Sequence, residues 1–116
     1  LGSLLAIDAV CLERVDVALL MSIGCPLGTD QGWRRLLAVK DFPTDRVGGW
    51  LNVVNTRDPI PWGCGIDSHY PFAVDAFVSA GCWPIGPRGA HDPGTYMGTR
   101  VVRDAIEWAA GLRVTA

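Results

Sequence analysis

The 116-residue sequence has few charged residues, no long uninterrupted apolar segment and no paired cysteine motif. Charged residues make up 19% of the chain, the formal net charge is −2 and no basic stripe occurs, so nucleic-acid binding has little electrostatic support. The longest apolar run, 17–27, is interrupted by Gly24 and Pro26 and is too short to span a membrane. The N-terminal apolar stretch has no positive region before it and contains Asp8. It therefore predicts no signal peptide, and the localisation stays open.

The cysteines and histidines form no recognisable metal-binding pattern. No C-x-x-C pair and no regular spacing relates the four cysteines, which are Cys11, Cys25, Cys64 and Cys82. We interpret them as reduced, buried side chains, with disulfides as the alternative for an exported protein. The spacing matches no zinc template among the residues that a metal site would have to combine, which are Cys64, Asp67, His69, Cys82 and His91. No phosphate-binding glycine loop follows a predicted strand either, so we expect no metal and no other cofactor.

The sequence is rich in short apolar segments that are separated by glycine and proline. Hydrophobic residues make up 49% of the chain, which suits one small domain with a modest core. Residues 3–14 carry a broad apolar face and predict a helix. Residues 15–23 and 50–55 are nearly continuous apolar runs, which predict strands covered on both faces. A short helix is predicted over 31–40, and a third strand over 74–79.

A final amphipathic helix is predicted over 95–112. Its apolar face contains Met97, Val101, Ala105, Trp108 and Leu112. Strands that alternate with helices in this way predict an α/β fold with a parallel sheet. Because three strands covered on both faces make a poor independent domain, we expect residues 1–116 to be the C-terminal portion of one larger domain.

Asp58 is the first candidate for a functional side chain. It follows the predicted strand 50–55, and Pro59 keeps its backbone out of helical conformation. In open parallel sheets the reacting groups lie at the carboxyl ends of the strands. A carboxylate there can accept the N–H of an imidazole and set its tautomer. The alternative is an Asp-Pro turn in which the side chain binds its own backbone.

His91 is the second candidate, in a loop rich in glycine and proline before the last helix. Asp92 can cap that helix, with Pro93 at its first position. The positive helix end disfavours an imidazolium unless a carboxylate compensates, and Asp58 can supply that carboxylate. The alternative is a surface histidine beside a cap. His69 is the competing base, and we interpret it as a loop or substrate-side residue.

The chain contains no convincing nucleophile. Ser3 lacks the glycines of a G-x-S-x-G elbow, Ser22 lies inside a predicted strand, and Ser68 follows the candidate acid in the wrong order. Cys25 ends a strand in a tight turn, so a thiolate nucleophile is conceivable there. Pro26 works against a backbone oxyanion donor at this turn, so we interpret Cys25 as a buried structural cysteine.

Four segments match motifs that occur in this order in one enzyme family. Residues 1–4 (L-G-S-L) match the tail of a G-H-S-L-G-S elbow, and 20–28 match a strand that ends in a G-S-P-L-G turn, with cysteine in place of the serine. Residues 50–60 match W-x-N-x-x-x-x-x-D-P-[VI], and 91–96 match H-x-x-x-x-Y. Together they resemble the C-terminal half of a lipase- or esterase-like α/β-hydrolase, over essentially the whole chain.

The resemblance implies a partial α/β-hydrolase fold that hydrolyses a carboxylic ester or, as an alternative, an amide or thioester. Asp58 would be the triad acid, His91 the general base and acid, and the backbone N–H of Leu1 one oxyanion donor. The nucleophilic serine would lie directly ahead of Leu1, so these residues alone would be inactive. The expected partner is a small-molecule ester or acyl substrate, and the oligomeric state stays open.

Two hypotheses from other classes remain. The same fold can serve as a non-catalytic binding domain, and the residue ahead of Leu1 would distinguish this case. Alternatively, the chain is a complete small α/β binding module with a functional Cys25 thiol, which alkylation would test.

Overall fold

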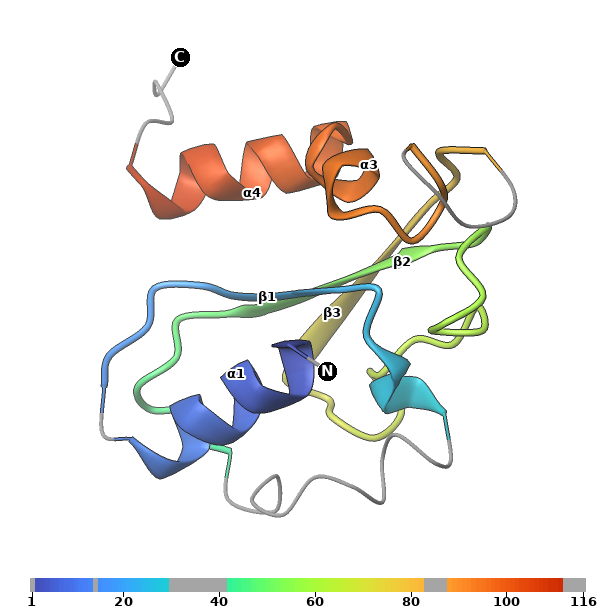
Figure 1. Cartoon of the computed structure of the whole chain (residues 1–116). Coiled ribbons are helices and arrows are strands. Elements are labelled where there is room, and N and C mark those ends of the chain that lie inside the picture. The colour runs from blue at the N-terminus through green and yellow to red at the C-terminus, as the bar shows by residue number, and fades with distance from the viewer. Residues whose placement is uncertain (1, 14, 30–41, 83–87, 112–116) are drawn as a thin grey trace.

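The computed structural model describes residues 2–13, 15–29, 42–82 and 88–111, and Figure 1 shows their arrangement. The described elements, in chain order, are α1 (Gly2–Leu12), β1 (Leu20–Ile23), the 3-10 helix η1 (Pro26–Gly28), β2 (Trp50–Asn55), β3 (Ala73–Val78), α3 (Pro93–Met97) and α4 (Arg100–Ala109). The helix predicted over 31–40 lies outside the described residues.

The three strands form one parallel sheet in the order β1-β2-β3. Leu20 pairs with Trp50, and Trp50 pairs with Ala73, so the strands start nearly level with one another. Strand β2 has the predicted bounds, and β3 begins one residue earlier than predicted. The prediction of an α/β fold with parallel strands is confirmed.

Strand β1 is shorter than the predicted strand over 15–23. Val17 makes only an isolated parallel bridge with Val47, and regular pairing starts at Leu20. Between them the backbone bends at Ala18, where Gly48 approaches so closely that a Cβ at position 48 would collide with the Ala18 carbonyl. This local contact separates the bridge from the strand.

Helices cover the two faces of the sheet. Helix α1 and η1 lie on one face, and α3 and α4 lie on the other (Figure 1). The face under α1 carries the larger buried cluster, formed by Ile7, Val10, Leu20, Cys25, Leu27, Val47, Trp50, Ile66, Tyr70 and Ala73. The opposite face carries a smaller cluster of Val53, Tyr96 and Val102, with half-buried neighbours such as Ile23 and Leu51. Because both faces of β2 are covered, five of its six residues are buried.

The single final helix that was predicted over 95–112 is wrong in its continuity. The structure breaks it into α3 and α4, because Thr99 has extended backbone angles of φ −75° and ψ 147° and acts as the N-cap of α4. Its hydroxyl donates to the Tyr96 carbonyl at 2.6 Å, which stabilises the break. A threonine hydroxyl that binds a backbone carbonyl three residues back competes with helix continuation.

The predicted apolar face of this helix is also only partly correct. Of its described members, Val101 and Ala105 are half-buried, whereas Met97 and Trp108 are 44% and 47% exposed. The fully buried residue is Val102, which the predicted face did not include. The break at Thr99 rotates α4 relative to α3, so one helical period does not extend through both. Leu112 lies outside the described residues.

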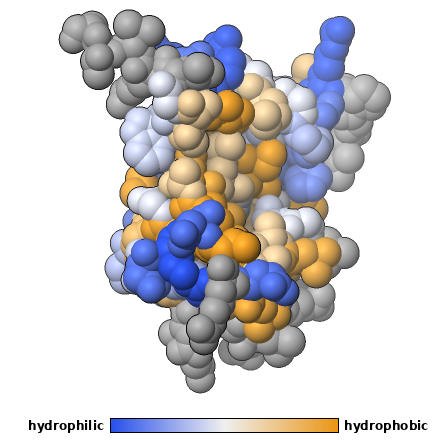
Figure 2. Space-filling model, turned by 90° about the vertical axis from the view of Figure 1, so that its left-hand side faces the viewer, coloured by the Kyte–Doolittle hydropathy of each residue, from blue (hydrophilic) through white to orange (hydrophobic). Residues whose placement is uncertain are grey.

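Apolar side chains also lie at the surface. Figure 2 shows that they gather on the side of the molecule that faces left in Figure 1, between hydrophilic groups. Helix α1 leaves Leu5 and Leu12 exposed, so its broad predicted apolar face is buried only around Ile7 and Val10. None of the helices in the described residues is long and apolar enough to cross a membrane.

Candidate functional site

The carboxyl ends of the three strands bring distant segments to one place. Gly24 directly follows β1, Asp58 follows β2 by three residues, and His91 lies in the loop between β3 and α3. Loops at this edge of a parallel sheet converge on one crevice. The two predicted site residues, Asp58 and His91, meet there.

Asp58 and His91 are joined by a direct side-chain contact. The distance between Nδ1 of His91 and Oδ2 of Asp58 is 2.8 Å. The Asp58 side chain is fully buried, whereas the His91 side chain is 42% exposed. An ionised carboxylate can only accept, so Nδ1 of His91 donates and Nε2 of the neutral ring carries the lone pair. The arrangement is a half-exposed base whose tautomer is set by a buried carboxylate.

The second carboxylate oxygen of Asp58 binds the backbone. Oδ1 accepts the backbone N–H of Ile60 at 2.9 Å, which closes a turn through Pro59. Both sequence interpretations of Asp58 therefore hold together, because one carboxylate oxygen binds its own backbone and the other binds His91. This division holds the carboxylate plane in one orientation.

Tyr96 is a third member of the group. Its hydroxyl donates to Oδ2 of Asp58 at 2.5 Å and accepts the backbone N–H of Asn55 at 3.3 Å. Burial and the contact with Asp58 raise the pKa of Tyr96 above its usual value. Tyr96 therefore stays protonated and remains a donor to the carboxylate.

Asn55, at the end of β2, anchors the segments around His91. Its buried amide nitrogen donates to the carbonyls of Ala80 and Ala90 at 2.8 and 3.0 Å. Its amide oxygen accepts the backbone N–H groups of Arg57 and Ala80. All polar groups of this buried side chain are satisfied, and the residue directly before His91 is tied to the sheet. Sequence reasoning assigned Asn55 no role, although an asparagine that ends a buried strand was the available signal.

The predicted cap at Asp92 is confirmed. Its Oδ1 accepts from the Gly94 backbone N–H at 2.9 Å, and Pro93 occupies the first turn of α3. Its Oδ2 accepts from the Arg88 backbone N–H at 2.8 Å, which closes the loop around His91. The hydrogen bond from Arg88, followed by that from Gly94, lowers the pKa of Asp92. Its carboxylate is therefore committed to the backbone of its own loop and of the start of α3.

Gly24 packs directly against the Asp58–His91 pair. Its φ of +55° is a conformation that favours glycine, and a Cβ there would lie 3.0 Å from Oδ2 of Asp58 and 3.2 Å from two ring atoms of His91. Glycine at this position thus allows the turn to form and leaves room for the Asp58–His91 pair. The glycine between a strand and the Cys25–Pro26 dipeptide was the sequence signal for it.

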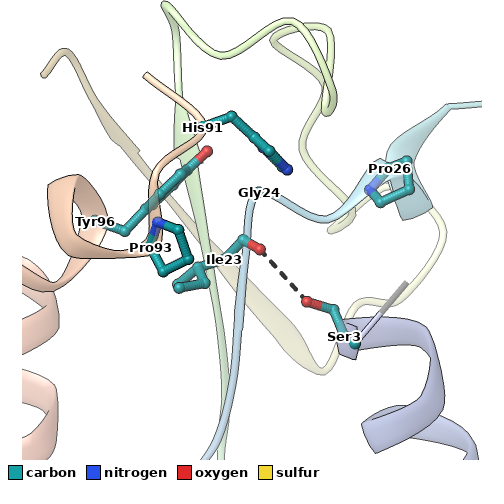
Figure 3. A pocket seen from close by; sticks show the side chains of 8 residues that line it. Ser3, Ile23, Gly24, Pro26, His91, Pro93 and Tyr96 are labelled. Atoms are coloured by element: carbon teal, nitrogen blue, oxygen red, sulfur yellow. Dashed lines mark hydrogen bonds between the residues drawn. The ribbon is translucent and has the colours of Figure 1, made fainter. Parts of the chain in front are cut away.

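A pocket of about 200 Å³ opens in front of His91. Figure 3 shows His91 and Tyr96 on one side, Pro26 on the other, and Ser3 at the start of α1 below them. The pocket is lined by Gly2, Ser3, Ile23, Gly24, Pro26, His91, Pro93 and Tyr96. The Ser3 hydroxyl donates to the Ile23 carbonyl at 3.4 Å, so it is directed at the β1 backbone. The first turn of α1 and the imidazole therefore share one cavity.

The other candidate residues lie elsewhere or are engaged. His69 lines a separate pocket with Phe42 and Trp50. Ser22 is buried and bonded to Asn52 and Trp50. Ser68 is exposed, and Leu1 lies outside the described residues.

The cysteines differ in their surroundings more than predicted. Cys25 is buried, as predicted, and burial raises the pKa of its thiol, which disfavours a thiolate nucleophile. Cys82 is exposed, and Cys11 and Cys64 are intermediate, so the prediction of buried cysteines is wrong for these three. No disulfide joins the four, all of which lie in described segments. The described residues contain no cluster of three or more histidine, cysteine or acidic side chains that could hold a metal ion.

A scan against protein-family models found no match for the chain, and searches of curated proteins and of solved structures found none either.

Proposed function

We propose that the chain forms part of a serine hydrolase that acts on carboxylic esters, with Asp58 as the triad acid and His91 as the base. The single observation that carries this proposal is the Asp58–His91 pair at the strand ends, with its carboxylate buried and its imidazole open to the pocket. An aspartate that sets the tautomer of a half-exposed histidine is the arrangement that activates a serine.

The position of α1 supports a nucleophile directly ahead of Leu1. Gly2 and Ser3, in the first turn of α1, line the same pocket as His91. A serine just before that turn would face the imidazole, and the backbone N–H groups at the helix start would be available to an oxyanion. The N–H of Leu1 is our candidate for one of these donors.

In the proposed reaction, Nε2 of His91 takes the proton from the serine hydroxyl as its oxygen attacks the ester carbonyl. Asp58 stabilises the imidazolium that forms, through the contact to Nδ1. His91 then returns the proton to the leaving alcohol, which leaves an acyl-enzyme. Water deprotonated by His91 releases the acid and restores the serine.

We also propose that the described sheet belongs to a larger α/β-hydrolase domain. Exposed apolar residues on α1, Leu5 at 60% and Leu12 at 72%, support a neighbouring layer there. Strand β1 forms an edge of the described sheet, where a further parallel strand would pair.

The test uses the full-length protein and a fluorophosphonate probe, which reacts with activated serines. We expect mass spectrometry to locate the label on the residue ahead of Leu1, and His91→Ala to abolish both labelling and ester hydrolysis. Asp58→Asn should lower kcat by roughly 10³- to 10⁴-fold, because it stabilises the wrong tautomer. Ser68→Ala is the matched control and should retain activity, because Ser68 is exposed and does not line the pocket in front of His91. Near-normal turnover in a folded His91→Ala or Asp58→Asn protein would refute the assignment.

A further inference from the structure

Oδ2 of Asp58 receives two donors, and only one of them is the imidazole. The Tyr96 hydroxyl lies 2.5 Å from this oxygen, and Nδ1 of His91 lies 2.8 Å from it. Since two strong donors share one acceptor atom, each reduces the negative charge that the other experiences. Tyr96 is therefore placed to affect His91 without touching it.

The direction of the Tyr96 hydroxyl proton follows from its other partner. The hydroxyl oxygen accepts the Asn55 backbone N–H at 3.3 Å, so its own proton is left for Asp58. Tyr96 is 1% exposed and is held between β2 and the helices by Val53 and Val102. Water is thus excluded from this side of the carboxylate.

We propose that Tyr96 is a positioning residue that binds the buried Asp58 carboxylate and thereby limits the proton affinity of His91. This inference rests on the proposed function, in which His91 must both take up and release a proton. A carboxylate whose only strong donor was the imidazole would hold the imidazolium more tightly and slow proton return to the leaving alcohol. The hydrogen bond from the Tyr96 hydroxyl to Asp58 weakens this stabilisation of the imidazolium.

Two charged side chains in the flanking loops, Asp92 and Arg57, are engaged away from Oδ2. The Asp92 carboxylate accepts from the backbone of Arg88 and Gly94. The Arg57 guanidinium donates to the Gly81 carbonyl at 2.9 Å. Tyr96 and His91 are therefore the groups whose removal changes the charge environment of Oδ2 most directly.

The direction in which the His91 titration midpoint moves in Tyr96→Phe distinguishes this role from a merely structural one. Proton NMR of the full-length protein follows the titration of His91, which is assigned by its disappearance in His91→Ala. We expect Tyr96→Phe to move the midpoint upward by about 0.5 to 1 pH unit, because Asp58 becomes a stronger acceptor. Asp58→Asn should move it downward, because the imidazolium loses its anion. The acid limb of the pH–rate profile should move in the same directions.

A structural role for Tyr96 would loosen the pair, so Tyr96→Phe would then move the midpoint downward, as Asp58→Asn does. That result, or no shift, overturns the proposal. Tyr70→Phe removes a hydroxyl from the other face of the sheet and is the matched control, which should leave the midpoint unchanged.

If Tyr96→Phe does not fold, 3-fluorotyrosine at position 96 is the second test. This stronger donor should lower the midpoint, and an upward shift would contradict the proposal. Because the titration needs no turnover, a protein that shows these shifts without ester hydrolysis refutes the proposed function but not the role of Tyr96.

Discussion

Gly24 offers the sharpest test of how the site is built, because one added methyl group reaches both members of the Asp58–His91 pair. In Gly24→Ala the new Cβ would lie 3.0 Å from Oδ2 of Asp58 and 3.2 Å from Cε1 and Nδ1 of His91. Such distances are too short for an undisturbed carbon, so the pair must shift by a few tenths of an ångström. The turn itself must also accept alanine at φ +55°.

Two effects lower the free energy of unfolding in Gly24→Ala. Alanine in the left-handed region costs roughly 1–2 kcal/mol of folding free energy. Weakening the charge-assisted contact between Asp58 and His91 adds about 1–2 kcal/mol, since hydrogen bonds to charged groups contribute roughly 1.5–3 kcal/mol. We therefore expect Gly24→Ala to lower the free energy of unfolding by about 2–4 kcal/mol in total. Ester hydrolysis should fall by roughly 10- to 100-fold, because the base is displaced.

Gly63→Ala is the matched control. Gly63 has a similar φ of +68°, but a Cβ there would meet nothing within 4 Å. It should show the cost of the backbone conformation alone, about 1–2 kcal/mol, with unchanged turnover. Urea denaturation and ester hydrolysis, measured on both variants of the full-length protein, give the comparison. Equal losses of stability and activity in the two variants would refute the close packing of Gly24 against the pair.

Two further predictions concern the same end of the sheet. Asn55→Ala should lower the free energy of unfolding by about 2–4 kcal/mol in urea denaturation, because the Ala80 and Ala90 carbonyls lose a buried donor; a loss below 0.5 kcal/mol would contradict the anchoring role. The raised pKa of Tyr96 means that its contribution to stability is fully present below pH ~10, the ordinary tyrosine pKa, and is lost as the pH rises further. The free energy of unfolding should therefore fall as the pH rises above about 10, and it should fall less steeply in Tyr96→Phe; equal slopes would show that Tyr96 ionises without cost.

The local patterns of the sequence were sufficient for the elements that are buried on both faces. Strand β2 has the predicted bounds because its nearly continuous apolar run is preceded by glycine and followed by a turn. The last helix was predicted less well, since the break at Thr99 depends on a backbone conformation that its apolar period does not encode. In the candidate site, the sequence pointed to Asp58 and the Asp92 cap because each precedes a proline, and to His91 because it lies in the glycine- and proline-rich loop directly before that cap.

The tertiary structure alone decided which residues meet those side chains. Tyr96 reaches Asp58 across 38 positions, and Asn55 reaches Ala90 across 35. Contacts at such separations follow from the parallel register of β1, β2 and β3 and from the packing of α3 on the sheet. The hydrophobic periodicity of a single segment does not predict either of these. The sequence by itself determined that a carboxylate and an imidazole follow two strands. Only the folded chain placed Gly24 against them and Tyr96 on the carboxylate, because those contacts require three strand ends to converge at one edge.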